Sequence, residues 1–299
     1  MLKIAYSPIY KYELPKDHRF PMIKYELIPE QLLYEGTVNE DQFFHPAALE
    51  ERIILKTHLA TYWEKLKHQR LSRKEERAIG FPMSERLVQR GRHIAQGTID
   101  CAKYAFQYGI AMNVAGGTHH SFTYKGEGFC LLNDIGIAAN YLLDEKLAHR
   151  ILVVDLDVHQ GNGTAEIFRQ EKRVFTFSMH GENNYPLRKE QSDLDIGLPD
   201  KTEDAAYLKH LRNTLPKLLD LHQPDFVFYL SGVDVIASDK LGRLALSLQG
   251  CKERDEYVLS TCREHQLPVA VSMGGGYAVR IADIVEAHAN TFRVAQSLI

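Results

Sequence analysis

Short apolar runs alternate with longer stretches of helical periodicity along the 299-residue chain. The runs have the length and composition of buried strands, which we expect at residues 3–6, 111–114, 151–158, 174–179, 226–232 and 268–273. Amphipathic spacing predicts helices at residues 47–67, 85–108, 133–143, 203–222, 252–265 and 281–297. This alternation predicts an α/β fold with a mostly parallel sheet and helices on both of its faces.

No linker, repeat or low-complexity tract divides the chain, so we expect one domain that spans residues 1–299. Residues 8–42 are rich in proline, tyrosine and charge, and we expect them to form an irregular loop region near the site. The basic run at residues 65–74 is followed by glutamates, which indicates a solvated helix end or loop.

Polar residues follow several predicted strands, at the sheet edge where parallel α/β folds bind ligands. Asp155, Asp157 and His159 alternate at the end of the run at 151–158, so they would share one face of a strand. Carboxylate and imidazole groups are zinc ligands, and a divalent cation would offset the cost of burying them. The alternative is a solvent-facing strand end or an ion-pair network.

Two adjacent histidines, His119 and His120, follow Gly116 and Gly117 directly after another apolar run. Paired glycines favour a tight turn that exposes the imidazoles. Histidine titrates near neutral pH and therefore suits proton transfer. Taken alone, such a pair is more often structural.

Two further strand ends carry candidate chemistry. Asp234 follows the run at 226–232 and would complete a set of three ligands with Asp157 and His159, leaving the open position of a catalytic zinc. A helix cap or a turn is its alternative role. Three glycines at 274–276 allow close backbone approach to a ligand, and Tyr277 would then point its hydroxyl into the site. A packed tyrosine in a flexible turn is the alternative.

Composition narrows the class of function. A net charge of −3 and a pI of about 6.5 give no global basic field, which argues against direct nucleic-acid binding. The four cysteines form no C-x-x-C pair, which argues for reduced thiols and against a cysteine-bound zinc. No apolar stretch has membrane-spanning length, and the N-terminal run is too short for a signal peptide, so we expect a cytoplasmic protein.

Five segments together resemble the histone deacetylase family and occur in the family's order: residues 116–120, 128–134, 155–163, 231–234 and 274–277. The resemblance covers residues 1–295, and the segments 157–163 and 239–244 are most similar to the class IV branch and its bacterial relatives. It implies the three-layer arginase–deacetylase fold with a sheet of about eight strands. It also implies an amidohydrolase that removes acetyl or longer acyl groups from lysine side chains.

The resemblance assigns a metal ion, zinc or in the cell ferrous iron, to Asp157, His159 and Asp234. His120 matches the general base and acid of the family. Tyr277 matches the residue that polarises the scissile carbonyl group.

The same resemblance makes His119 an electrostatic neighbour of His120, paired with Asp155. Asn162 stands where class I enzymes place the acidic partner of the second histidine. A neutral amide raises an imidazole pKa less than a carboxylate does. We therefore expect His120 to be less basic than a carboxylate-paired histidine.

Substrate contacts are expected from the matching tunnel and rim positions, which are Gly128, Phe129, Tyr185, Leu241 and Gly275. The family also carries a monovalent cation, usually potassium. Its ligands match backbone carbonyls of Asp155, Asp157 and His159, together with Ser178 and Met179.

Three other functions remain open at this stage. A relative could deacylate acetylpolyamines or small acyl amides, which acidic residues at the tunnel mouth would favour; the candidates are Glu13, Asp17, Glu26, Glu182 and Glu190. An arginase-like hydrolase would need the ligands of a second metal. A catalytically silent module would only bind acyl-lysine. The expected partner is an acylated lysine protein or peptide, or a small acylated amine; the sequence leaves the oligomeric state open.

Overall fold

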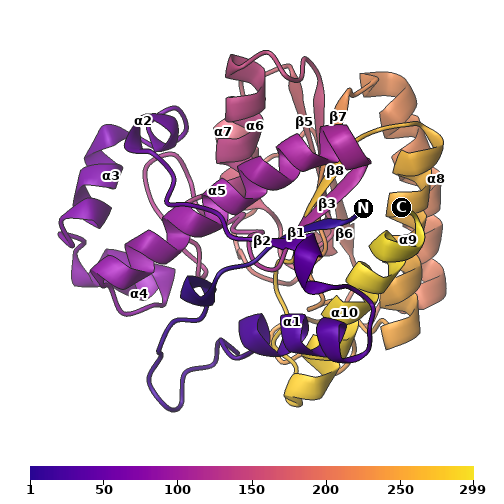
Figure 1. Ribbon diagram of the computed structural model, residues 1–299, viewed down its shortest axis with the longest axis horizontal. Coiled ribbons are helices and arrows are strands. Elements are labelled where there is room, and N and C mark those ends of the chain that lie inside the picture. The colour runs from indigo at the N-terminus through magenta and orange to yellow at the C-terminus, as the bar shows by residue number, and fades with distance from the viewer.

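A computed structural model describes all 299 residues, and its centre is a sheet of eight parallel strands in the order β2-β1-β3-β8-β7-β4-β5-β6 (Figure 1). The strands are β1 (Lys3–Ala5), β2 (Phe43–Phe44), β3 (Ile110–Asn113), β4 (Ile151–Asp155), β5 (Val174–Gly181), β6 (Leu194–Leu198), β7 (Phe226–Leu230) and β8 (Val269–Ser272). All seven strand pairings are parallel, so the carboxyl ends of the strands lie at one edge. The parallel α/β prediction is confirmed.

Helices cover both faces of the sheet (Figure 1). They are α1 (Lys24–Tyr34), α2 (Glu51–Ile54), α3 (Ala60–Lys67), α4 (Arg73–Ile79), α5 (Glu85–Tyr108), α6 (Asp134–Asp144), α7 (Asn162–Phe168), α8 (Asp204–His222), α9 (Leu248–Glu264) and α10 (Ile281–Ser297), with 3-10 turns at Pro8–Tyr10 and Glu40–Gln42. Helices α5, α6 and α7 pack in series on one face, and α1, α10, α9 and α8 pack in series on the other. No helix combines the length and the apolar character that a membrane crossing requires.

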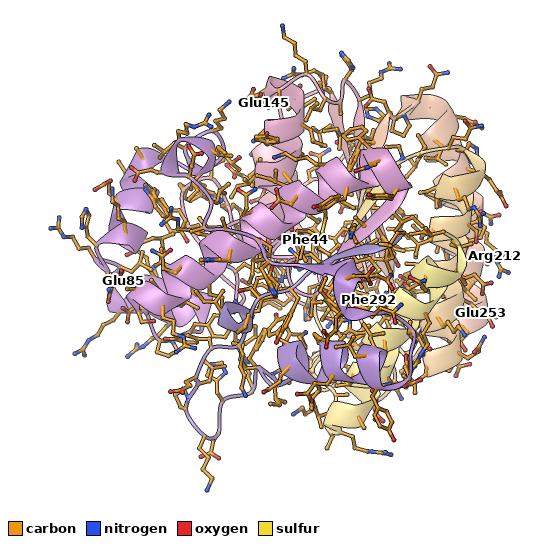
Figure 2. All side chains as sticks on the ribbon, in the orientation of Figure 1. Phe44, Glu85, Glu145, Arg212, Glu253 and Phe292 are labelled. Atoms are coloured by element: carbon orange, nitrogen blue, oxygen red, sulfur yellow. The ribbon has the colours of Figure 1, made fainter.

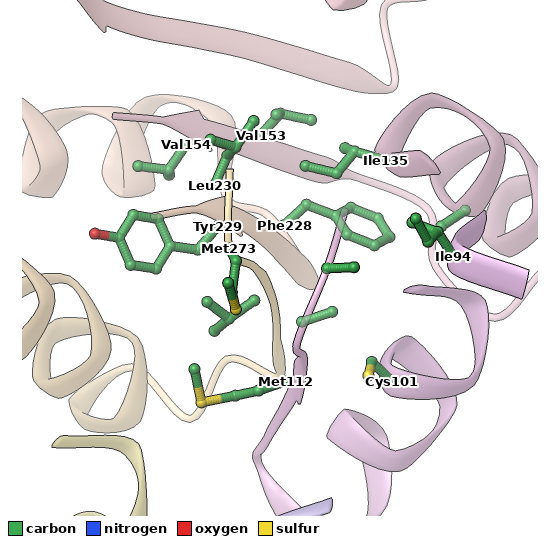
Figure 3. Close-up of a cluster of buried hydrophobic side chains, with 14 of the residues drawn as sticks. Ile94, Cys101, Met112, Ile135, Val153, Val154, Phe228, Tyr229, Leu230 and Met273 are labelled. Carbon is green, nitrogen blue, oxygen red and sulfur yellow. The ribbon is translucent and has the colours of Figure 1, made fainter. Parts of the chain in front are cut away.

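The sheet is buried on both faces, which explains why its strands read as continuous apolar runs. Every residue of β4 and β7 is buried. Figure 3 shows Val153 and Val154 of β4 beside Tyr229 and Leu230 of β7 in this core. Charged side chains at the outer helix surfaces point outward, as Figure 2 shows for Glu85. The dense core gives the strand ends a rigid support for a site.

Six of the eight strands match the apolar runs, and two were missed. Strands β2 and β6 are short edge strands with partly exposed residues, so they carry no continuous apolar run. The run at 151–158 was predicted too long, because β4 ends at Asp155. The Asp157 N–H bonds the Asp155 carboxylate rather than a neighbouring strand, so the chain leaves the ladder there. The alternation expected up to His159 is therefore wrong.

The helix expected at 47–67 is interrupted. The chain forms α2 and α3, and residues 55–59 between them turn toward the 121–133 loop. The Leu59 N–H donates to the Thr123 carbonyl, and the buried His58 ring bonds the Phe122 carbonyl. These long-range contacts outweigh the local helical periodicity, which tertiary packing often does.

Two helices lie in segments that the sequence indicated to be irregular. Helix α1 occupies part of the 8–42 region, and α4 occupies the charged segment that follows α3. Helix α4 begins with a capping box in which Ser72 accepts from the Glu75 N–H and Glu75 bonds back to Ser72. The glutamates that suggested a solvated loop thus stabilise a helix start.

A buried arginine, Arg254 of α9, holds the backbone just beyond β4 and β7 in place by hydrogen bonds. It donates to the carbonyls of Leu156 and Gly232, at 3.1 and 2.6 Å, and pairs with the neighbouring Asp255. All of these groups are shielded from water, so both charges depend on this geometry. The arginine ties the segment after β4 to the segment after β7.

We expect Arg254→Met to lower the free energy of unfolding by about 3–5 kcal/mol, because Asp255 would keep a buried charge without its partner. Urea denaturation measures the effect. The matched control is Lys252→Met, at a partly exposed position of the same helix, with an expected change within about 0.5 kcal/mol. A loss below about 1 kcal/mol in the Arg254 variant would contradict the proposed support.

Candidate active site

Three buried side chains meet at the carboxyl ends of β4 and β7. Asp157 and His159 lie in the loop after β4, and Asp234 lies in the loop after the adjacent β7. Their ligand atoms lie within 4.8 Å of one another. The His159 Nδ1 atom is 3.0 Å from Asp157 Oδ1 and 3.1 Å from Asp234 Oδ2. The structure thus brings together the three residues assigned to a metal.

Glycine backbone presses against both carboxylates of this cluster. The Gly275 N–H donates to Asp157 Oδ2 at 2.8 Å. A β-carbon at Gly275 would lie 1.9 Å from Asp234 Oδ2, and one at Gly232 would lie 2.2 Å from Asp157 Oδ2. Only glycine fits at either position. Gly275 was expected to contact substrate; it lines the inner cavity, but its support of the ligand carboxylates was missed.

The ionisable groups of the cluster shift each other's pKa values strongly. Burial, followed by the charge of Asp157, raises the pKa of Asp234 to about 7. Burial alone would lower the pKa of His159, but its bonds to the two carboxylates raise it to about 10. The buried Lys24 nearby donates to the Gly274 carbonyl instead. Two buried carboxylates and an imidazole within one ion's reach fit the donor set of a divalent metal.

The histidine pair lies beside this cluster, and each ring bonds a different partner. His119 Nδ1 is 2.7 Å from Asp155 Oδ2, and His120 Nδ1 is 2.7 Å from Asn162 Oδ1. Both rings are buried, with centroids 4.1 Å apart. Asp155 therefore belongs to the histidine pair.

The pKa values of the two histidines are shifted in opposite directions. Burial opposes the charge of His119, but Asp155 outweighs it and the pKa of His119 is raised. The pKa of His120 is lowered well below its usual value by burial and by the charges of His119 and His159, and the bond to Asn162 only partly opposes this. His120 is therefore a neutral base near pH 7.

Tyr277 follows the triple glycine and lies buried next to the cluster. Its ring centroid is 6.4 Å from that of His159 and 5.9 Å from that of Phe129. Burial, followed by the charges of Asp234 and Asp157, raises the pKa of Tyr277 well above its usual value. Its hydroxyl therefore stays protonated and can donate a hydrogen bond to an oxyanion.

Sequence reasoning missed the role of Asp239. Its carboxylate accepts from the Tyr277 N–H at 2.5 Å and from the N–H groups of Leu241 and Gly242 at 2.8 Å. One carboxylate thus fixes both the backbone of Tyr277 and the loop that carries Leu241 and Gly242. Asp239 begins a segment that carried the family resemblance, but only the contacts across 38 residues reveal its function.

An outer cavity of about 390 Å³ leads to the cluster and is lined by Arg19, Arg77, Ala78, His120, Gly128, Phe129, His159, Tyr185, Leu241 and Tyr277. Behind it lies an inner cavity of about 40 Å³. Five residues line both: His120, Gly128, Phe129, His159 and Tyr277. Four of the five expected substrate contacts, all but Gly275, line the outer cavity.

The loop that carries Gly128 and Phe129 is held in a constrained conformation. Both residues have positive φ, and a β-carbon at Gly128 would lie 2.5 Å from the His120 ring. Their N–H groups donate to the carbonyls of Ala78 and Ile79 at the end of α4. The unpredicted helix α4 therefore positions one wall of the cavity, and Phe129 tolerates a conformation that costs a large residue free energy.

The residues expected to bind a monovalent cation lie at the end of β4, in the loop that follows it and on the neighbouring β5. Asp155 pairs with Ser178 in the register of β4 and β5, and Met179 is fully buried next to it. The Ser178 hydroxyl bonds His180 Nδ1 at 2.9 Å. The cation site itself stays a prediction.

A family model of the histone deacetylase domain matches residues 18–292. An uncharacterized protein of Picosynechococcus is 44% identical over 295 residues, which is 99% of this chain and 98% of that protein. Histone deacetylase 2 of Arabidopsis thaliana is 29% identical over 301 residues, covering 95% and 78% of the two chains.

Two solved structures share the fold. An HDAC homolog complexed with SAHA has a TM-score of 0.84 at 24% identity and covers 99% of this chain and 83% of its own. The HD domain of HDA15 has a TM-score of 0.81 at 20% identity and covers 99% and 88%. These similarities identify the arginase–deacetylase fold.

Proposed function

This chain belongs to the histone deacetylase family, and from that premise we propose that it hydrolyses the amide bond of acylated lysine side chains. Asp157, His159 and Asp234 would hold the catalytic zinc, with ferrous iron as the alternative in the cell. The observation that carries the proposal is the position of this buried donor set. It lies between a neutral histidine base and a protonated tyrosine, where the outer cavity ends.

A divalent metal bound there would polarise the substrate carbonyl and make water more acidic. His120 accepts a proton from the attacking water at Nε2, since its Nδ1–H donates to Asn162. It then delivers that proton to the leaving lysine amine. His119, held by Asp155, fixes the neighbouring ring at van der Waals distance. Tyr277 donates its hydroxyl hydrogen to the oxygen that becomes negative as the carbonyl carbon turns tetrahedral.

The charges around the mouth favour lysine peptides over polyamines. Arg19 and Arg77 line the outer cavity, and no acidic side chain does. None of the five acidic residues considered from the sequence lies there; Glu26 pairs with Lys11 and Glu190 with Arg169. A substrate with several further cations would meet like charge.

The space behind the donor set favours short acyl groups. The inner cavity of about 40 Å³ has room for roughly three water molecules, at 10–15 Å³ for each. Buried side chains such as Phe20 and Ile94 close it. An acetyl group fits this volume, whereas a long acyl chain would require the core to open. We therefore propose acetyl-lysine as the preferred substrate.

The proposed function is tested by turnover of acetyl-, octanoyl- and myristoyl-lysine peptides and of acetylated polyamines, using the zinc-loaded and the iron-loaded protein. Acetyl-lysine should give the highest kcat/KM. Faster turnover of acetylpolyamines would assign the site to small amines, and faster turnover of myristoyl-lysine would overturn the size argument. Tight binding of the peptides without hydrolysis would indicate a silent acyl-lysine-binding module.

We expect Tyr277→Phe to lower kcat/KM about 10²–10³-fold, because one donor to the developing oxyanion is lost. Metal content and thermal stability should not change, since the substitution removes only the hydroxyl and keeps the ring packed beside Phe129 and His159. Tyr124→Phe, at a half-exposed position, is the matched control. Turnover of the Tyr277 variant within about twofold of the control would remove this tyrosine from the mechanism.

A further inference from the structure

Glu127 lies next to the cavity wall and contacts Asn162, which bonds the proposed base, and Tyr185, which lines the outer cavity. It immediately precedes Gly128 and Phe129, whose backbone is pinned to α4. Its side chain is only 13% exposed, although it carries a carboxylate. The sequence indicated no role for Glu127, so we infer its role from the groups that it contacts.

Three donors converge on this carboxylate. Its Oε1 atom accepts from Asn162 Nδ2 at 2.8 Å and from the Tyr185 hydroxyl at 2.7 Å. Its Oε2 atom accepts from Lys125 Nζ at 2.7 Å. Burial raises the pKa of Glu127, but these three bonds outweigh it and the pKa is lowered. The carboxylate is therefore ionised and acts only as an acceptor.

An ionised acceptor at this position determines how the Asn162 amide is oriented. Only the NH2 group of Asn162 can face Glu127, so its oxygen must face His120 Nδ1, 2.7 Å away. That oxygen requires a hydrogen on Nδ1, which leaves Nε2 of His120 free to accept a proton. A flipped amide would select the opposite tautomer, in which Nε2 already carries a hydrogen.

The same carboxylate holds the opposite wall of the cavity. The Tyr185 ring stands at 90° to the His120 ring with centroids 5.0 Å apart. Tyr185 is itself 41% exposed, so packing alone does not fix it. Its bond to Glu127 anchors it at the place where a substrate side chain would pass.

We propose that Glu127 is a positioning residue, which acts through Asn162 to fix the tautomer of His120 and which anchors Tyr185 at the cavity wall. The inference rests on the proposed function for the role of His120. In this site the Asn162 amide lies between the ionised Glu127 carboxylate and the His120 base. Glu127 thus orients the amide, and the amide selects the tautomer of His120, while the negative charge of Glu127 does not contact the base directly.

The first test is Glu127→Gln, whose carboxamide can turn either its oxygen or its nitrogen toward Asn162. We expect kcat to fall about tenfold or more at unchanged metal content. In an Asn162→Ala background, the same substitution should lower kcat much less, because Glu127 acts on the base through Asn162; any remaining loss reflects the Tyr185 anchor. Glu182→Gln, an exposed acid outside the cavity, is the matched control. An equal fall in both backgrounds would overturn the proposal.

The tautomer is read directly by ¹⁵N NMR of histidine-labelled protein, with His120 assigned by comparison with His120→Ala. Wild type should carry its hydrogen on Nδ1, and Glu127→Gln should give a mixture. An unchanged tautomer would overturn the proposal. This measurement needs no substrate, so it stands even when no acyl-lysine peptide is hydrolysed, an outcome that would refute the proposed function alone.

A charge swap covers the case in which Glu127→Gln does not fold. Asn162→Asp places two carboxylates in contact and should lower kcat. Adding Glu127→Gln to that variant supplies an NH2 donor again, and kcat should recover about tenfold. A double variant no more active than Asn162→Asp would contradict the series arrangement of Glu127, Asn162 and His120.

Discussion

His120→Ala is expected to lower kcat/KM about 10²–10⁴-fold while the protein keeps its metal. His120 lies outside the set of three ligand residues, so its removal leaves those ligands in place. Its Nε2 is the proton acceptor of the proposed mechanism, and the other imidazole of the pair, His119, is held by Asp155 with a raised pKa. Steady-state kinetics and metal analysis of the same preparation measure the two effects.

The matched control is His149→Ala, at an exposed position outside the cavities. Loss of metal from the His120 variant would mean that this residue is a ligand. The pH profile of the wild type provides a second check. Since the pKa of His120 is lowered, it stays neutral until the pH falls well below 6.5, and the acidic limb of kcat/KM should lie there. A limb above pH 6.5 would contradict the assignment.

Asp234→Asn is expected to abolish tight metal binding and, with it, activity. The substitution removes one of two carboxylates in the donor set and leaves a neutral amide in its place. Metal analysis after dialysis should give substoichiometric zinc. Asp220→Asn, an exposed position on α8, is the control. Stoichiometric zinc in the Asp234 variant would remove this residue from the donor set.

In the metal-free protein, Asp234→Asn should be favourable, because it should increase stability. Burial raises the folded-state pKa of Asp234 from 3.8 to about 7, so ionisation of this group disfavours the folded state. Its contribution to stability is present below pH 3.8 and is lost as the pH rises toward 7. Metal-free Asp234→Asn should therefore gain in melting temperature over metal-free wild type across that range. A difference that does not vary with pH would contradict this account.

Much of the site followed from the sequence because parallel strands end at one edge. Asp157 and Asp234 follow strands that are continuous apolar runs, and such runs are readily recognised. Their meeting also requires that β7 lies beside β4, although the carboxyl ends of these strands, Asp155 and Leu230, are 75 positions apart in the sequence. The family resemblance supplied that order; periodicity did not.

What the sequence did not predict depends on contacts between distant segments. Glu127 is adjacent to a recognised motif, but no spacing reveals its bond to Asn162. Arg254 reads as an ordinary polar position of a helix, although it is fully buried under the strand ends. The break between α2 and α3 likewise results from bonds to the 121–133 loop.

The hydrogen bonds from Gly128 and Phe129 to the end of α4 have a consequence for how substrate range can change. The passage is positioned by a peripheral helix, whereas the donor set lies in the loops after β4 and β7. Substitutions in α4 can thus widen or narrow the passage without touching the three proposed metal ligands. Because Glu127 lies in the same loop and reaches His120 through Asn162, such changes can alter substrate range and the orientation of the base together while metal binding stays constant.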